Sequence, residues 1–169
     1  MDAAVVYESA WGNTRAVAEA VAAGMSGRVR VELFDVEHAP APHELAVDLL
    51  VVGGPTHALG MSRPSTRQDA ADRGGHALQR GIREWLEGTE PLDVRAAAFD
   101  THVRHPNLPG HAGRKAAKVL RRRGADLIAA PESFYVRDAE GPLLDGELER
   151  ARTWGAELAG LLPQHSYTA

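Results

Sequence analysis

The stretch Ser9-Ala10-Trp11-Gly12-Asn13-Thr14 decides the fold, because it joins an apolar run at residues 3–8 to a helical pattern at residues 13–25. A strand that turns sharply into a helix leaves backbone N–H groups unpaired at the helix start, where the helix dipole is positive. The side chains of the stretch add hydroxyls, an amide and an indole N–H, and its glycine lets a ligand approach the backbone. This set of donors predicts a site for a phosphate monoester. The open alternative is an N-capped turn without a ligand.

Strand-like and helix-like segments alternate along the rest of the chain. Strand patterns cover residues 3–8, 29–35, 48–54, 94–100 and 126–136, the last of which is interrupted at Pro131. Helical patterns cover residues 13–25, 43–46, 77–88, 112–123 and 146–162. Residues 56–76 and 101–109 have no convincing periodicity and are expected to be loops. In the second strand, Val29, Val31 and Leu33 are expected to face inward. Five strands that alternate with helices predict an α/β fold with a parallel sheet covered on both faces.

Three candidate ligand loops follow the first, third and fourth strands. Ligands of such sheets bind at the carboxyl ends of the strands, near the point where the strand order switches. For a strand order of 2-1-3-4-5, that point lies between the loops that start at Ser9 and Pro55. The loop after Asp100 closes the same end of the sheet. The joint placement of these loops indicates one binding site.

The first loop resembles the phosphate loop of the flavodoxin family, which reads Ser/Thr-x-Thr/Tyr-Gly-x-Thr. Ser9, Gly12 and Thr14 match this pattern, whereas Trp11 stands where the family usually has a hydroxyl. The resemblance covers essentially the whole chain. It implies a flavodoxin-like three-layer α/β/α sandwich, with a five-stranded parallel sheet of order 2-1-3-4-5, and FMN as a non-covalent cofactor. It also implies which residues contact the FMN. The phosphate would be held by Ser9, Ala10, Trp11, Gly12, Asn13 and Thr14. The ring and the ribityl chain would be contacted from one side by Pro55, Thr56 and His57, and from the other side by Asp100, Thr101 and His102.

The sequence departs from the family in its second and third loops. Many flavodoxins place aromatic side chains there against the flavin ring, whereas these loops contain no Trp, Tyr or Phe, and His57 and His102 are their only flat side chains. Imidazole covers less area than indole, so an open ring would leave room for a substrate. Basic residues near these loops predict that the rim of the flavin site is not acidic. They also predict a midpoint potential of the hydroquinone couple that is less negative than in an acidic flavodoxin. These residues are Arg63, Arg67, Arg73, Arg104, Arg114, Lys115, Lys118 and Arg121–Arg123. The last three are better explained as a solvated helix end.

The composition excludes several classes of protein. The 169 residues fit one domain, assigned to residues 1–163, with a short tail at residues 164–169. The absence of cysteine excludes disulfides, thiolate metal sites, iron–sulfur clusters and cysteine nucleophiles. No apolar run reaches the length of a membrane span, so we expect a cytoplasmic protein without a membrane partner. No aromatic platform accompanies the basic helix, so no nucleic acid is expected.

Two other readings of the polar residues are weaker. His102, His105 and His111 resemble a metal cluster with Asp100 as a fourth ligand, but they lie on a loop without helical spacing, and no metal is expected. A serine hydrolase would need a Gly-x-Ser-x-Gly elbow, which the chain lacks.

The favoured function is therefore electron transfer through bound FMN, with a redox partner protein or a small electron donor or acceptor. One alternative is an FMN-dependent NAD(P)H or quinone reductase. The other is a flavodoxin-fold interaction module that has lost flavin. No catalytic residue is assigned, and the sequence leaves monomer and homodimer open.

Overall fold

The molecule is built on a parallel sheet whose strands are formed by the apolar runs of the sequence. The structure is a computed structural model that describes residues 1–88, 90–104 and 110–164. Its strands are β1 (Asp2–Tyr7), β2 (Arg30–Asp35), β3 (Leu49–Pro55), β4 (Arg95–Val103), β5 (Asp126–Leu127) and β6 (Glu132–Val136). Its helices are α1 (Asn13–Met25), α2 (Pro64–Asp72), α3 (Ile82–Leu86), α4 (Ala112–Arg122) and α5 (Glu147–Gly160), with a short 3₁₀ turn, η1 (Pro42–Glu44).

The strand order is β2-β1-β3-β4-β5, and neighbouring strands are parallel. This confirms the predicted order. In the register of the central strands, Val5 lies opposite Leu33 on one side and Val51 on the other. The fifth position of the sheet is shared by two segments, because β5 and β6 both pair with β4. Pro131 lies between these segments, so the interruption expected there is confirmed. After it, β6 pairs with the part of β4 that is nearer the carboxyl edge of the sheet.

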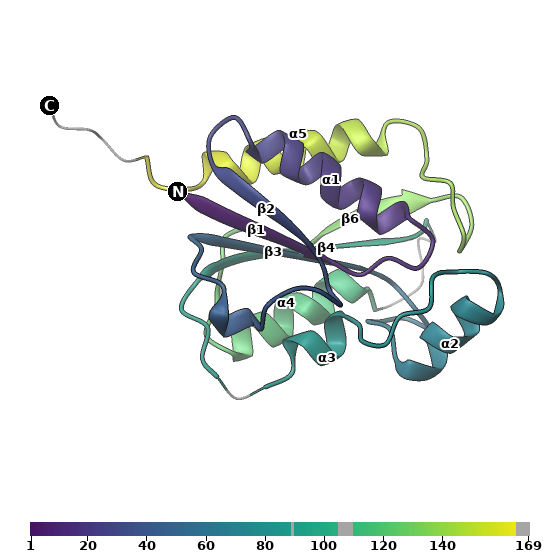
Figure 1. Ribbon diagram of the computed structural model, residues 1–169. Helices are drawn as coiled ribbons and strands as arrows, with labels where there is room; N and C mark the ends of the chain where they lie inside the picture. Colours follow the sequence, from purple (N-terminus) through teal and green to yellow (C-terminus); the bar gives the residue numbers. More distant parts are fainter. Residues whose placement is uncertain (89, 105–109, 165–169) are drawn as a thin grey trace, which may run out of the picture.

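Helices cover both faces of the sheet, as the nearly continuous burial of β1 and β3 requires (Figure 1). α1 and α5 lie on one face, and α3 and α4 lie on the other. Side chains of β1 alternate between the two layers. Ala3, Val5 and Tyr7 join the core beneath α1 and α5, whereas Ala4 and Val6 join the core beneath α3 and α4.

α1 and α5 approach each other at two glycines. A methyl group added at Gly24 would lie 2.0 Å from the backbone oxygen of Arg152, and one added at Gly155 would lie 2.1 Å from the backbone oxygen of Val21. Real side chains never come so close to a carbonyl oxygen, so only glycine permits this helix contact. The contact fixes α1, and with it the loop that precedes α1.

Two of the expected loops are partly regular. Residues 64–72 form α2, although the sequence predicted no structure there, because this helix buries only Arg67 and Ala70 and therefore has almost no apolar period. Its start signal is local: Pro64 is its first residue, and the backbone N–H of Arg63 donates to Thr66 Oγ1 at 2.9 Å. Likewise, β4 continues three residues beyond its expected end, to Val103.

Two further expectations need correction. The helix predicted at residues 77–88 is confined to α3, because the preceding chain is irregular and bonds to the loop after β1 through the His76 N–H and the Ala10 oxygen. In β2, Leu33 is 38% exposed rather than inward, because β2 is an edge strand with a neighbouring strand on one side only.

No helix in the described ranges is both long and apolar enough to cross a membrane. Most of the predicted tail, residues 165–169, lies outside the residues that the structure describes.

Candidate functional site

A cleft of about 310 Å³ lies at the carboxyl edge of the sheet. It is bounded by the loops after β1, β3 and β4, by α2, and by the end of β6. Its lining comprises Ser9, Ala10, Trp11, Asn13, Thr14, Pro55, Thr56, His57, Ala58, Thr66, Asp69, Arg73, Thr101, His102, Val103, Val136 and Ala139. The structure thus brings together the predicted site residues from all three loops, except that Gly12 and Asp100 do not line the cleft.

The first loop leaves the start of α1 open to the cleft. Gly12 is the N-cap residue of α1, with a φ of 88°, and no side chain caps the helix. The Gly12 N–H instead donates to Ser9 Oγ at 3.0 Å. Because this bond uses a lone pair of the Ser9 oxygen, the hydroxyl proton of Ser9 stays available. The N–H groups of the first helical turn and this hydroxyl form an anion site of the predicted kind.

Thr14 and Thr101 connect the first loop to the third. Their hydroxyl oxygens are 2.8 Å apart, and both residues are buried. One contact consumes one of the two hydroxyl protons, so the pair retains one proton that can be donated to a ligand. The two loops are thereby held at a fixed separation at the floor of the cleft.

Two residues of the first loop also contact segments beyond the predicted site. A methyl group at Gly75 would lie 3.2 Å from the indole of Trp11, so this glycine makes room for the ring just after α2. Asn13 Nδ2 donates to the backbone oxygen of Glu140 at 3.1 Å, which ties α1 to the loop after β6. Both contacts close the sides of the cleft.

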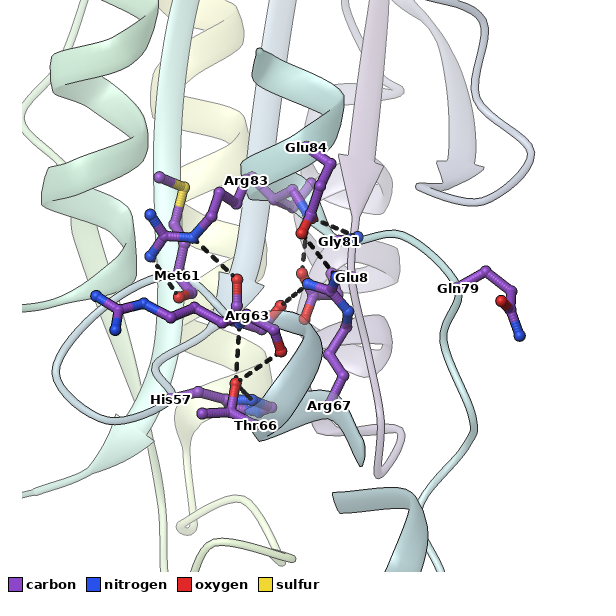
Figure 2. A network of polar contacts seen from close by, with 12 residues as sticks. Glu8, His57, Met61, Arg63, Thr66, Arg67, Gln79, Gly81, Arg83 and Glu84 are labelled. Carbon is purple, nitrogen blue, oxygen red and sulfur yellow. Dashed lines mark hydrogen bonds and ion pairs between the residues drawn. The ribbon is translucent and has the colours of Figure 1, made fainter. Parts of the chain in front are cut away.

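α2 forms a wall of the cleft and is anchored by a buried arginine. Arg67 is 4% exposed, and its guanidinium donates to Glu84 at 2.7 Å and to Ser62 Oγ at 2.9 Å. Figure 2 shows the Arg67 side chain directed from α2 toward Glu84 and Glu8. The sequence had placed Arg67 on a basic rim. The structure instead assigns it to this internal ion pair, which holds Thr66, Asp69 and Arg73 against the cleft.

Glu8 lies directly before the first loop and beneath it. It is 1% exposed, its Oε1 accepts the Ile82 N–H at 2.8 Å, and its Oε2 has no partner in the described part of the chain. Burial raises the pKa of this carboxyl, although its bonds with Ser62 and Ile82 and the charge of Arg67 oppose the rise. Glu8 therefore holds its proton more readily than a free carboxyl does, and it supports the loop from below.

His57 lies in a tight turn at the end of β3. Its N–H and carbonyl bond with Gly60 at 2.8 and 3.1 Å, and the two residues between them, Ala58 and Leu59, have left-handed φ values of 46° and 69°. The imidazole Nδ1 lies 3.3 Å from Thr66 Oγ1. Burial lowers the pKa of His57, and the nearby charges of Arg67 and Arg73 lower it further. His57 thus presents a neutral ring to the cleft at neutral pH.

Asp100 lies behind His102 rather than on the cleft surface. It is 1% exposed, and its Oδ2 accepts the Gly113 N–H at 2.8 Å at the start of α4. Its Oδ1 lies 2.7 Å from His102 Nδ1. Asp100 therefore joins β4 to α4 and orients the imidazole of His102, a role that its position in the sequence did not reveal.

The rings next to His102 hold it on both sides. His102 stacks on His111, with centroids 4.2 Å apart and planes 15° apart, and meets the Tyr135 ring edge-on at 5.3 Å and 89°. Burial lowers the pKa of His111, and the neighbouring His102 lowers it further. Asp100, His102 and His111 have ligand atoms within 4.8 Å of one another, and the contact with Asp100 Oδ1 already occupies His102 Nδ1. His105, the other histidine of the sequence cluster, lies outside the described residues.

Asp69 and Arg73 are the charged lining residues of the cleft in the described ranges, apart from its histidines. Four basic side chains of neighbouring segments are exposed; they are Arg63, Arg104, Arg114 and Lys115. By contrast, Arg123 donates to the backbone oxygens of Leu86 and Glu90 at 3.0 and 2.6 Å and has a structural role.

Sequence reasoning missed six residues of the lining: Ala58, Thr66, Asp69, Val103, Val136 and Ala139. Arg73, which the sequence placed on the rim, does line the cleft. The α2 residues were missed with the helix itself, whose capping signal at Pro64 and Thr66 was the available clue. Val136 is the last residue of β6, the segment that follows the interruption at Pro131. No local sequence pattern shows which residue of β6 lines the cleft.

Comparisons with known proteins agree on the fold. No protein-family model matches the sequence, and no curated protein sequence matches it. Among solved structures, the chain is similar to oxidised Flavodoxin 2 from Bacillus cereus, with a TM-score of 0.71, 20% identity, and coverage of 96% of this chain and 100% of that one. It is similar to a flavodoxin from the domain Archaea, with a TM-score of 0.66, 21% identity, and coverage of 95% and 97%. It is also similar to a flavodoxin, WrbA-like protein from Agrobacterium tumefaciens, with a TM-score of 0.59, 21% identity, and coverage of 95% and 96%. These similarities confirm that the chain has the flavodoxin-like fold.

Proposed function

We propose that the chain binds FMN in the cleft at the carboxyl edge of the sheet and transfers electrons through it. The observation that carries this proposal is the open start of α1 at the cleft, beside the Thr14–Thr101 hydroxyl pair. In the described part of the chain, this helix has no side-chain cap, so its N–H groups and dipole are left for an anion at the switch point of the sheet.

The residues present fit the phosphate and the flavin in different ways. For the phosphate, the stretch from Ser9 to Thr14 offers neutral donors and the helix end, without Lys or Arg. For the ring and ribityl chain, the cleft offers mixed walls of indole, imidazole and small apolar side chains around Pro55, Val103 and Val136. Such a combination of an anion end and an apolar cleft suits a phosphorylated aromatic cofactor.

FMN supplies one- and two-electron chemistry when it is bound. The protein binds the phosphate, orients the ring between the second and third loops, and sets the local electrostatics. His57, neutral at neutral pH, presents a polar atom without a charge on one side. His102, oriented by Asp100, presents another on the opposite side. Asp69 and Arg73 carry opposite charges, so the exposed basic residues nearby are what support the less negative potential expected from the sequence.

A second candidate function is FMN-dependent reduction of a small substrate. The observation that favours it is that few aromatic side chains line the cleft and could stack on a flavin ring. Within the described residues, Trp11 is the one Trp, Tyr or Phe that lines the cleft. A ring with one open face has room for a second planar molecule.

The visible absorption spectrum of the purified protein, with and without added FMN, tests this proposal. We expect the two flavin bands, shifted from those of free FMN, and quenched flavin fluorescence at one equivalent. A protein that leaves the spectrum of added FMN unchanged would refute the proposal and favour an interaction module. Anaerobic addition of NADPH then separates the two redox functions, because a reductase bleaches the bands without a partner, whereas a carrier needs a partner protein.

A further inference from the structure

We propose that His102, positioned by Asp100, is the proton-donating residue of this cleft, and that the small electron acceptor is therefore a quinone-type molecule that takes up protons with its electrons. This inference rests on the proposed binding of FMN. It deepens the second candidate function, the reduction of a small substrate, because an electron carrier between proteins needs no proton donor in its cleft.

The hydrogen bonds of Asp100 fix the tautomer of His102. Gly113 N–H donates to one carboxylate oxygen at 2.8 Å, and His102 Nδ1 lies 2.7 Å from the other. An ionised carboxylate accepts hydrogen bonds only, so Nδ1 must carry a proton and donate it. The second ring nitrogen, Nε2, is then the atom that can gain and release a proton.

Nε2 of His102 has no hydrogen-bond partner in the described part of the chain, and His102 lines the cleft. The side chain is 11% exposed, so its free nitrogen has access to the cleft but little access to bulk water. An imidazole that is tied at one nitrogen and free at the other is the arrangement of a general acid and base.

Two aromatic rings contact His102, and guanidinium groups lie beyond one of them. His111, from the segment before α4, stacks on the ring, and its own pKa is lowered by burial and by His102. Tyr135 of β6 packs edge-on against the ring, with the guanidinium groups of Arg104 and Arg150 over its own face at 5.3 and 5.6 Å. Arg114 also faces His111 and disfavours charge there. His111 therefore stays neutral beside His102, whose Nδ1 is bound to the Asp100 carboxylate.

The acceptor chemistry follows from this donor. A quinone takes up two electrons and two protons to become a hydroquinone. FMN, held by the loops after β1, β3 and β4, would supply a hydride equivalent drawn from a pyridine nucleotide, and one quinone oxygen would gain its O–H bond in this way. The electron pair displaced from the carbonyl moves to the second oxygen, which becomes an anion. The imidazolium of His102 transfers its Nε2 proton to this anion, becomes neutral imidazole, and regains a proton from water.

The test compares two acceptors in the FMN-loaded protein with NADPH as the donor. Benzoquinone needs a proton at the acceptor, whereas ferricyanide takes up electrons alone. We expect His102→Gln to lower the rate with benzoquinone about 100-fold, as is typical for the loss of a general acid. The ferricyanide rate should fall much less, so the ratio of the two rates drops by about tenfold or more. The matched control is His76→Gln, because His76 is a 66%-exposed histidine outside the cleft, and its ratio should equal that of the wild type.

Asp100 is a positioning residue, and it has a readout that does not depend on turnover. In ¹⁵N NMR spectra, His102 of the wild type should carry its proton on Nδ1. In Asp100→Asn, an amide can donate to Nδ1, so the proton should move to Nε2. An equal fall of both acceptor rates in His102→Gln, or a wild-type proton on Nε2, would overturn this inference while FMN binding stands. A wild-type protein that takes up no FMN would overturn the proposed function and this inference together.

Discussion

The hydroxyl oxygens of Thr14 and Thr101 lie 2.8 Å apart in the buried floor of the cleft, and they connect the start of α1 to the end of β4. Thr101→Val keeps the shape of the side chain but leaves the Thr14 hydroxyl buried without its partner. We expect the free energy of unfolding to fall by about 1–3 kcal/mol, as measured by urea denaturation. Thr101→Ser keeps the hydroxyl and is the control. A valine variant as stable as the serine variant would show that the contact contributes nothing.

Gly24→Ala should destabilise the protein through the contact between α1 and α5. The added methyl group would lie 2.0 Å from the Arg152 oxygen, so one helix must move away from the other. Overpacking of this kind costs about 1–3 kcal/mol, which chemical denaturation would detect. Gly27→Ala is the matched control just beyond the helix, since no atom lies within 4 Å of the added methyl group there. Equal stability of the two variants would contradict the close contact.

Glu8→Gln should make the protein more stable at high pH. Burial raises the pKa of Glu8 above the value of 4.5 expected in the unfolded chain. The stability contributed by its neutral form is fully present below that unfolded value and is lost as the pH rises through the folded value. Glutamine stays neutral at every pH. The melting temperature of Glu8→Gln should therefore exceed that of the wild type at pH 8–9, and the gap should close toward pH 4. A gap that does not change with pH would contradict this account. Glu19→Gln, on the exposed face of α1, is the control.

Arg73→Gln should raise the pKa of His57. Burial, Arg67 and Arg73 all lower this pKa below the ordinary value of 6.5. Removal of one of the two nearby charges relieves part of the effect, whereas removal of the exposed Arg63 should not. The chemical shifts of the imidazole, followed by NMR from pH 4 to 8, give each value. A His57 that titrates at or above the ordinary value in the wild type would show that the ring is not buried beside these charges.

The parts of the fold that could be predicted from sequence are those with local signals. The apolar run of β3 and the strand–glycine–helix transition at Gly12 can each be recognised within about ten residues, so these elements and the three loops could be predicted from them, whereas the strand order came from the resemblance to the flavodoxin family. The interruption of the fifth strand was likewise visible at Pro131.

The parts that could not be predicted depend on contacts between distant residues. α2 is stabilised by Arg67, whose partner Glu84 lies 17 residues away, so its own sequence shows no apolar stripe. Asp100 looked like a surface ligand because it follows a strand. Its partner Gly113 appears only once α4 has packed against β4. Sequence patterns identify faces and loops, but they do not show which polar side chains are paired inside.

The binding of FMN at the start of α1 is tested most directly by a pair of glycine variants. Gly12 and Gly146 are both N-cap residues, of α1 and α5, with φ values of 88° and 83°, no side-chain cap, and no atom within 4 Å of an added methyl group. Alanine at either position carries a similar backbone strain of about 1–2 kcal/mol, so both variants should lose similar stability. Only Gly12 lies in the loop that faces the cleft. FMN titration followed by flavin fluorescence should give an affinity weakened about tenfold or more in Gly12→Ala, and an unchanged affinity in Gly146→Ala. Equal affinities in the two variants would contradict the assignment of the phosphate to this loop.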